Sequence, residues 1–226
     1  MKRALLTAAL VAIASTASAL SIVNTKHDLS TTSTATFTAP LVKSTTTNQI
    51  CIFCHTPHNP TQKVPLWNRT NPDATGWQMY NSPTISATAK AKLATGNFDA
   101  DSISLFCMSC HDGVTTMGAF SNHADVTNPD TTGVIPAGSK ANIGNAGKDL
   151  RDDHPVGFNY ETAQSEDTGL HSLADAQTAL GGSAFFGSTG QMIECASCHK
   201  VHDNAAPPFL RKTNAASALC LACHDK

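Results

Sequence analysis

One short pattern, repeated four times, constrains this chain more than any other feature of its sequence. Each copy has two cysteines separated by two residues and followed at once by a histidine, and the four copies use all eight cysteines of the 226 residues. The cysteines are Cys51, Cys54, Cys107, Cys110, Cys195, Cys198, Cys220 and Cys223, and the histidines are His55, His111, His199 and His224. C-x-x-C-H is the attachment signal of c-type haem, in which two thiols add to one porphyrin and the histidine becomes the proximal iron ligand. The sequence therefore predicts four covalently bound haem c groups.

Two other uses of paired cysteines compete with this interpretation, and neither explains the histidines. Structural disulfides of exported proteins have scattered spacings and do not require a histidine after the second cysteine. Zinc sites would join C-x-x-C units in pairs and would also leave the four histidines without a role. Because all four motifs end in histidine, haem attachment is the interpretation we adopt.

The composition fits a polypeptide that does not build its own core. Hydrophobic residues make up 41% of the chain, but much of this share is alanine, and aromatic residues make up 6%. Such a chain buries little apolar surface with its own side chains. We therefore expect a multihaem cytochrome c fold, with mostly loops and short helices wrapped around a stack of four haems and with little sheet.

The first 19 residues have the features of a secretory signal peptide. Lys2 and Arg3 precede a short apolar run over residues 4–14, and small residues end the segment at Ala19. The run is about half of the roughly 20 residues that a membrane span needs. The residue directly after Ala19 is not a cysteine, which argues against a lipoprotein. We expect a mature protein, residues 20–226, that is soluble and exported to the extracellular space or the outer cell surface, with the periplasm as the alternative.

The charge balance gives no sign of a nucleic-acid partner. The chain has 15 basic and 17 acidic residues, and removal of Lys2 and Arg3 leaves 13 basic residues and a net charge of −4. A nucleic-acid partner would call for a basic patch.

The histidines outside the motifs are the candidates for the second face of each iron. Six remain, and four irons need four such distal ligands. An iron with histidine on both faces has no open position for a substrate, so it carries electrons and does not activate a molecule. Methionine is the other common ligand, but few are present and Met108 lies inside a motif. The favoured distal set is His27, His58, His154 and His202, with His123 and His171 as substitutes.

His58 and His202 each follow a motif histidine by three residues, and this spacing decides what they cannot do. Ligands on opposite faces of one iron have α-carbons roughly 12 Å apart. Three helical residues advance about 4.5 Å, and three extended residues reach about 11 Å. Each of these histidines must therefore bind the haem of a different motif, which brings neighbouring haems close together.

The order of the motifs suggests a loose tandem repeat, with halves at about 20–130 and 131–226. Each half has a lone histidine, a motif with the extra histidine, a proline-containing apolar segment and a second motif. The apolar segments are residues 64–67 and 207–210. Residues 121–150 are rich in Asn, Asp, Gly, Thr and Pro, and we interpret them as a loop between the halves.

Local signals predict a few short helices. Residues 84–95 should form a helix that ends at Gly96, and Ser172 should cap a helix that ends at Gly181. Two further helices should carry the second and fourth motifs, near 101–111 and 214–224, with Asn214 as a cap for the last. The Thr-rich residues 20–50 favour extended structure.

The paired motifs resemble those of the multihaem cytochromes of metal-respiring bacteria. With its leader, its length and its four motifs, the chain is similar to extracellular tetrahaem cytochromes that polymerise into electron-conducting filaments. The resemblance implies four His/His-ligated haems stacked in a continuous chain. It also implies a homopolymer in which a histidine of one subunit ligates a haem of the next, with other redox cytochromes or extracellular acceptors as further partners.

By this resemblance the inter-subunit ligand corresponds to His58, which would complete a terminal haem, that of His224, in a neighbouring subunit. The second haem would then need His123 or another spare histidine. The tandem repeat within the sequence predicts a different haem for His58, because it pairs His58 with the second haem, that of His111.

Three functions compete at this point. The first is the filament, the second is a monomeric periplasmic electron shuttle, and the third is a multihaem reductase enzyme. The enzyme needs an iron with a free face, whereas all four motifs here end in histidine and spare histidines are plentiful. We therefore expect an electron carrier and not an enzyme.

Overall fold

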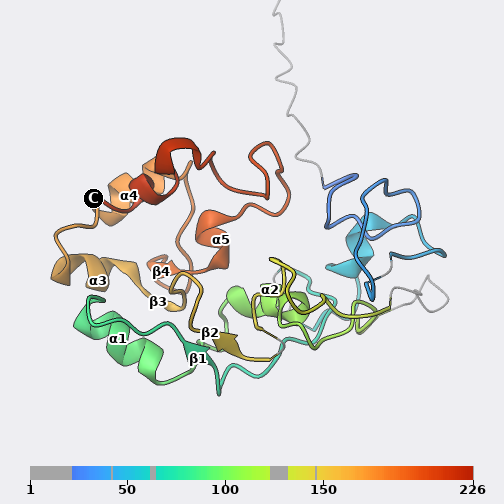
Figure 1. Cartoon of the computed structure of the whole chain (residues 1–226), viewed down its shortest axis with the longest axis horizontal. Coiled ribbons are helices and arrows are strands. Elements are labelled where there is room, and N and C mark those ends of the chain that lie inside the picture. Colours follow the sequence, from blue (N-terminus) through green and yellow to red (C-terminus); the bar gives the residue numbers. More distant parts are fainter. Residues whose placement is uncertain (1–21, 42, 62–64, 123–131, 146, 226) are drawn as a thin grey trace, which may run out of the picture.

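The computed structural model describes residues 22–225 apart from 42, 62–64, 123–131 and 146. The expected leader, residues 1–19, and His123 lie outside the described residues. Short helical turns and two-residue strands are separated by long loops (Figure 1). The elements in chain order are η1 (Ile50–Phe53), β1 (Gln78–Met79), α1 (Ala87–Ala94), α2 (Ser104–His111), β2 (Asp149–Leu150), β3 (Phe158–Asn159), α3 (Tyr160–Glu166), α4 (Leu173–Ala179), β4 (Met192–Ile193), α5 (Cys195–Cys198), η2 (Ala215–Ser217) and η3 (Cys220–Ala222). The expectation of loops, short helices and little sheet is confirmed.

Serine caps begin two of the helices that the sequence predicts. The Ser86 hydroxyl accepts a hydrogen bond from the Ala89 N–H at the start of α1. The Ser172 hydroxyl accepts from the Asp175 N–H at the start of α4. Such caps satisfy backbone donors that have no partner inside the helix. The helices predicted at 84–95 and after Ser172 are confirmed.

The predicted helix at 214–224 is wrong. The segment consists of two 3-10 turns, η2 and η3, instead of one continuous helix. Ala216 and Ser217 have φ angles of 51° and 62°, in the left-handed region that breaks a right-handed helix. Asn214 does not cap η2 through its side chain, and its Oδ1 instead accepts from the Leu219 N–H. The earlier motif helix is confirmed as α2.

Two small sheets and α3 complete the scaffold, and no local pattern in the sequence predicts them. β1 pairs in parallel with β2, and β3 pairs antiparallel with β4. α1 packs against α3 and β3, while α2 packs against α5. No regular strand lies in the described part of residues 22–50, so the extended structure expected there takes the form of turns and irregular chain.

Two hydrophobic clusters hold these elements together. The larger joins Trp77 and Leu93 to Phe158 and Tyr160, so it takes residues from both proposed halves of the chain. The smaller surrounds the first motif and contains Leu29, Phe53, Met117, Phe120 and Ile135. The clusters therefore do not follow the boundary near residue 130, and the tandem halves stay a prediction.

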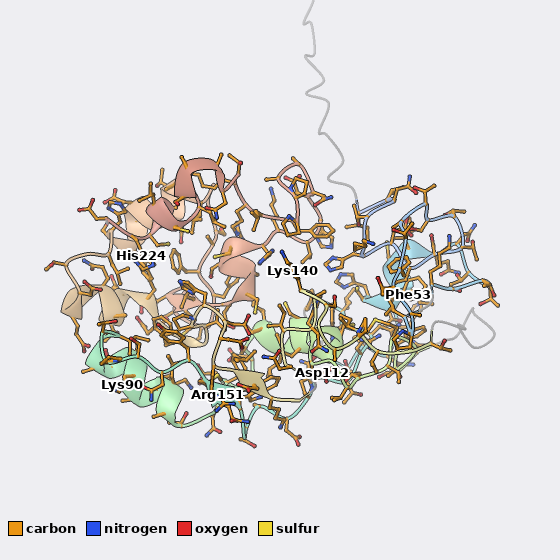
Figure 2. The ribbon with its side chains drawn as sticks, viewed as in Figure 1. Phe53, Lys90, Asp112, Lys140, Arg151 and His224 are labelled. Carbon is orange, nitrogen blue, oxygen red and sulfur yellow. The ribbon has the colours of Figure 1, made fainter. Side chains whose placement is uncertain are left out.

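The motifs are spread along the longest axis of the molecule. Figure 2 labels Phe53 of the first motif, Asp112 directly after the second and His224 of the fourth, in that order across the view. Within the described residues, no helix has the length and apolar character that crossing a membrane requires.

Candidate haem-attachment sites

Each motif forms one tight helical turn, and this turn is what brings its two thiols together. The N–H of His55 donates to the Cys51 carbonyl at 2.8 Å, and the N–H of His224 donates to the Cys220 carbonyl at 2.9 Å. His199 closes the third motif on Cys195 in the same way. The second motif lies in the longer helix α2. All eight cysteines are free thiols, as haem attachment requires.

Three of the motif histidines, His55, His111 and His199, are held by backbone carbonyls. Nδ1 of His55 lies 2.8 Å from the Pro65 carbonyl oxygen, and Nδ1 of His199 lies 3.0 Å from that of Pro208. Nδ1 of His111 lies 2.6 Å from the Ala141 carbonyl oxygen. A histidine that donates from Nδ1 presents Nε2 as the free, neutral ligand atom, and metal-binding histidines commonly have such a partner.

These contacts explain the two proline-containing apolar segments of the sequence. Residues 65–67 run beside the first motif, where His55 forms a β-bridge with Trp67. Residues 207–210 run beside the third motif, where His199 forms a β-bridge with Leu210. The segments therefore orient the proximal imidazoles, and their recurrence in the sequence reflects one local structure built twice.

Three of the four motif histidines face a second imidazole. The ring centres of His27 and His111 lie 6.0 Å apart, those of His55 and His202 also 6.0 Å, and those of His154 and His224 6.2 Å. Two metal–nitrogen bonds of about 2 Å, plus the distance from each nitrogen to its ring centre, separate two imidazoles on one metal by about 6 Å. The three pairs therefore have the spacing that one iron between them requires.

These pairs agree with one geometric argument from the sequence and differ from another. His202 faces the histidine of a different motif, as the three-residue spacing demands. His27 and not His58 faces His111, and His154 and not His58 faces His224. Both pairings considered for His58, with the second haem and with that of His224, therefore differ from the arrangement in the structure.

His27 lies among aromatic rings and other histidines. Its ring stacks on Phe209 with centres 4.4 Å apart. Burial, together with the smaller influence of the nearby His111, His199 and His202, lowers the pKa of His27 to about 3. Burial also lowers the pKa of His111 and of His202. These imidazoles are therefore neutral near pH 7, which is the state that binds a metal.

His199, in the third motif, differs from the other three motif histidines in the part of the chain that the structure describes. In the described part of the chain, no second histidine ring packs against it. His58 is exposed, and its side chain makes no hydrogen bond or ring contact with the described residues. His171 is half-buried beside the fourth motif, where its N–H donates to the Cys223 carbonyl. His123 lies outside the described residues.

The cysteines of successive motifs are neighbours in space. The pairs near enough to influence each other electrostatically are Cys54 with Cys110, Cys107 with Cys195, and Cys198 with Cys223. The closest is the middle pair, in which the Cys107 and Cys195 thiols hydrogen-bond to each other. The attachment points therefore follow one another in the order of the sequence, which the sequence analysis did not resolve.

The surroundings of the first motif also suit a porphyrin. The Trp67 ring lies 5.7 Å from that of His55, and its Nε1 is buried without a hydrogen-bond partner among the described residues. A buried donor of this kind needs an acceptor, and a haem carries two carboxylates. Burial raises the pKa of Cys54 to about 12, so this thiol is neutral in its apolar surroundings. The residues present therefore fit the group.

Two buried charged residues near the motif cysteines were missed by the sequence analysis. Arg69 and Glu194 are 0% and 2% exposed. Neither lies in a recognisable motif, and no local signal in the sequence points to them.

Each of the four motifs has the pattern of a covalent haem-attachment site. Residues 189–226, which hold the third and fourth motifs, match a family model described as the doubled CXXCH motif. This paired motif indicates a multihaem c-type cytochrome, a haem-binding protein of electron transfer. No curated protein matches the chain.

Proposed function

We propose that this protein is an exported tetrahaem cytochrome, related to the OmcE-like filament cytochromes, whose four irons are each held by two histidines. The observation that carries the proposal is the set of three imidazole pairs with ring centres 6.0–6.2 Å apart. Each iron would take up and release one electron by cycling between its ferric and ferrous states.

The residues have separate roles in this proposal. The eight motif cysteines hold the porphyrins, and the motif histidines are the proximal ligands. His202 is the distal ligand opposite His55, His27 opposite His111, and His154 opposite His224. The carbonyls of Pro65, Ala141 and Pro208 orient the proximal rings. With both faces of an iron occupied, no position stays open for a substrate, so the proposed role is electron transfer without catalysis.

The neighbouring cysteines support a continuous path for electrons. Attachment points that follow one another from the first motif to the fourth would bring four haems into one row. A row that ends near the surface at both ends of the molecule suits exchange with another copy, with other redox cytochromes or with an extracellular acceptor.

The filament is the assembly that best explains His58 and His199. His199 lacks a second imidazole among the described residues, and His58 is exposed, with no side-chain hydrogen bond or ring contact to the residues that the structure describes. In the proposed assembly, His58 of one subunit completes the third haem, that of His199, in the next. The proposed target of His58 is therefore the third haem, and not the fourth as expected from the sequence, because His154 already faces His224.

A monomeric periplasmic shuttle is the second candidate, and one observation favours it. His171 is anchored beside Cys223, and Cys223 neighbours Cys198 of the third motif. If His171 served the third haem within the same chain, no second subunit would be needed.

Substitution of single histidines distinguishes the filament from the monomeric shuttle. We expect His58→Ala protein to lose filaments in electron micrographs of sheared cell-surface material and to show one haem without a second imidazole. His171→Ala is the matched control and should assemble normally. The shuttle is the correct reading if His171→Ala produces the altered haem and His58→Ala does not.

Export is tested separately. N-terminal sequencing of protein recovered from the cell exterior should begin at Leu20, because cleavage is expected after Ala19. Recovery from the periplasm alone would favour the shuttle, and an uncleaved N-terminus would overturn the prediction of a signal peptide.

A further inference from the structure

Arg69 is a buried cation at the junction of the first two motifs. Its guanidinium donates to the carbonyls of Ser109, Thr116 and Met117 at 2.8–3.2 Å. No carboxylate lies within ion-pair distance of it among the described residues. Backbone carbonyls satisfy its hydrogen bonds but do not neutralise its charge, which acts strongly where water is excluded.

The charge of Arg69 acts on cysteines of both neighbouring motifs. It opposes the rise in the pKa of the Cys54 thiol and that of the Cys110 thiol, which burial causes in both. Asp112 is the opposing charge near Cys110, and its influence there is smaller than that of Arg69. The Asp112 carboxylate accepts hydrogen bonds from Val114 and Thr115. The surroundings of Cys54 and Cys110 are therefore positive on balance.

Glu194 is the opposite charge at the junction of the second and third motifs. Its carboxylate accepts hydrogen bonds from the Ser102 hydroxyl at 2.7 Å and from the N–H and hydroxyl of Ser104. No cation lies within ion-pair distance of it among the described residues. Its charge contributes to raising the pKa of Cys107 and opposes the fall in the pKa of Cys195. The charged groups that act on this site are also acidic, since Asp99, which pairs with Lys92, lies near Glu194, and Asp153 lies near Cys195.

The two charges therefore divide the row of attachment points. Arg69 follows Asn68, whose N–H donates to the Cys54 carbonyl of the first motif, and its guanidinium donates to the Ser109 carbonyl beside Cys110. Glu194 directly precedes Cys195 of the third motif, and its carboxylate accepts hydrogen bonds from Ser104 at the start of α2, the helix of the second motif. Reduction of a haem iron adds one negative charge, so a nearby cation favours the reduced state and a nearby anion favours the oxidised state.

We propose that Arg69 and Glu194 set the relative reduction potentials of the haems. Arg69 raises the reduction potential of the haem at the first motif, and Glu194 lowers that of the haem at the third. Electron transfer is then downhill from the third motif to the first, and the row of haems has a direction. This inference rests on the proposed function, because it requires haem at these motifs.

The deciding experiment is a spectroscopic redox titration of the haem-loaded protein at about pH 8, where a carboxyl group with an ordinary or moderately raised pKa is ionised. We expect Glu194→Gln to raise the lower of the haem reduction potentials. Glutamine keeps a hydrogen-bond acceptor and the shape of the side chain but removes its charge. The matched control is Glu166→Gln, since the Glu166 carboxylate is exposed and bonds to Thr88 away from the motifs. A tenfold change in the one-electron equilibrium corresponds to about 59 mV.

The cation is tested in the same way. Arg69→Gln should lower the higher potentials, whereas Arg69→Lys, which keeps the charge, should shift them less. Arg151→Gln is the control, because Arg151 is exposed and pairs with Asp149. The inference is overturned if the Glu194 and Arg69 variants, each with four attached haems, have the same potentials as their controls.

A measurement on the unaltered protein covers the case in which a variant fails to mature. Nuclear magnetic resonance of partially reduced protein, with haems assigned through their histidines, gives the order of reduction. The haem of His55 should be reduced before that of His199, and the reverse order would overturn the inference. Loss of haem attachment itself, shown by mass spectrometry, would instead count against the proposed function.

Discussion

The imidazoles of His55 and His202 face each other with ring centres 6.0 Å apart, although they belong to different motif segments. His202 follows its own motif by three residues and is directed to the first motif instead, where Nδ1 of His55 is already held by the Pro65 carbonyl. The chain after the third motif thus supplies a partner for His55 through His202 and holds His199 through the Pro208 carbonyl, and so it links the first and third motifs.

Replacement of His202 tests this relationship. We expect His202→Ala to convert one of the four haems from a low-spin to a high-spin or water-bound state, because the opposite face of the first iron becomes open. Electron paramagnetic resonance of the oxidised protein measures this change. Lys200→Ala, on the same loop and exposed, is the control and should keep four low-spin haems. An unaltered spectrum for His202→Ala would show that another residue binds that iron.

The cap of α4 should contribute measurably to stability. Removal of the Ser172 hydroxyl leaves the Asp175 N–H without its partner, and such losses cost about 1 kcal/mol. We expect Ser172→Ala to lower the free energy of unfolding by about that amount in a denaturant titration followed by tryptophan fluorescence. Ser188→Ala, on the loop before β4, should change it by less than about 0.5 kcal/mol. Equal values for the two variants would contradict this role of the hydroxyl.

Gly96 ends α1 in a conformation that leaves no room for a side chain. Its φ is +64°, and an added Cβ would lie 2.6 Å from the Trp77 carbonyl oxygen. We expect Gly96→Ala to lower the thermal unfolding midpoint more than Gly181→Ala, which has a φ of +81° but open space around it. Both variants carry the cost of a left-handed backbone, roughly 1 kcal/mol, so the difference reports the contact. Similar midpoints would show that the Trp77 segment moves aside.

The buried carboxyl group of Glu194 should make stability depend on pH in a defined direction. Burial raises its pKa above the usual 4.5 in the folded protein. Between these two values the folded state binds more protons than the unfolded state, so the free energy of unfolding falls as the pH rises. Glu194→Gln should remove this part of the pH dependence, measured by denaturant titrations at several pH values, and Glu166→Gln should keep it. A variant with the same slope as the unaltered protein would contradict this assignment.

The sequence predicts local features of this protein well, because each depends on residues close together in the chain. The attachment motifs, α1, α2 and the Ser172 cap all follow from short patterns. The segment near 214–224 fails because the left-handed conformations of Ala216 and Ser217 belong to residues that usually avoid them.

Long-range relationships could not be predicted in the same way. The sequence proposes His27, His58, His154 and His202 as a set, but nothing local shows that His27 faces His111 or that His154 faces His224. Arg69 and Glu194 illustrate the same limit, because a lone charged residue in a loop is indistinguishable from a solvated one until the chain folds around it.

The measurement that tests the account most directly is low-temperature near-infrared magnetic circular dichroism of the oxidised, assembled protein. Charge-transfer bands in this region distinguish two imidazoles on a ferric haem from one imidazole with methionine or water. The account predicts four haems, all low-spin with two imidazoles each. A methionine-ligated, water-bound or vacant site at any of the four motifs would contradict it.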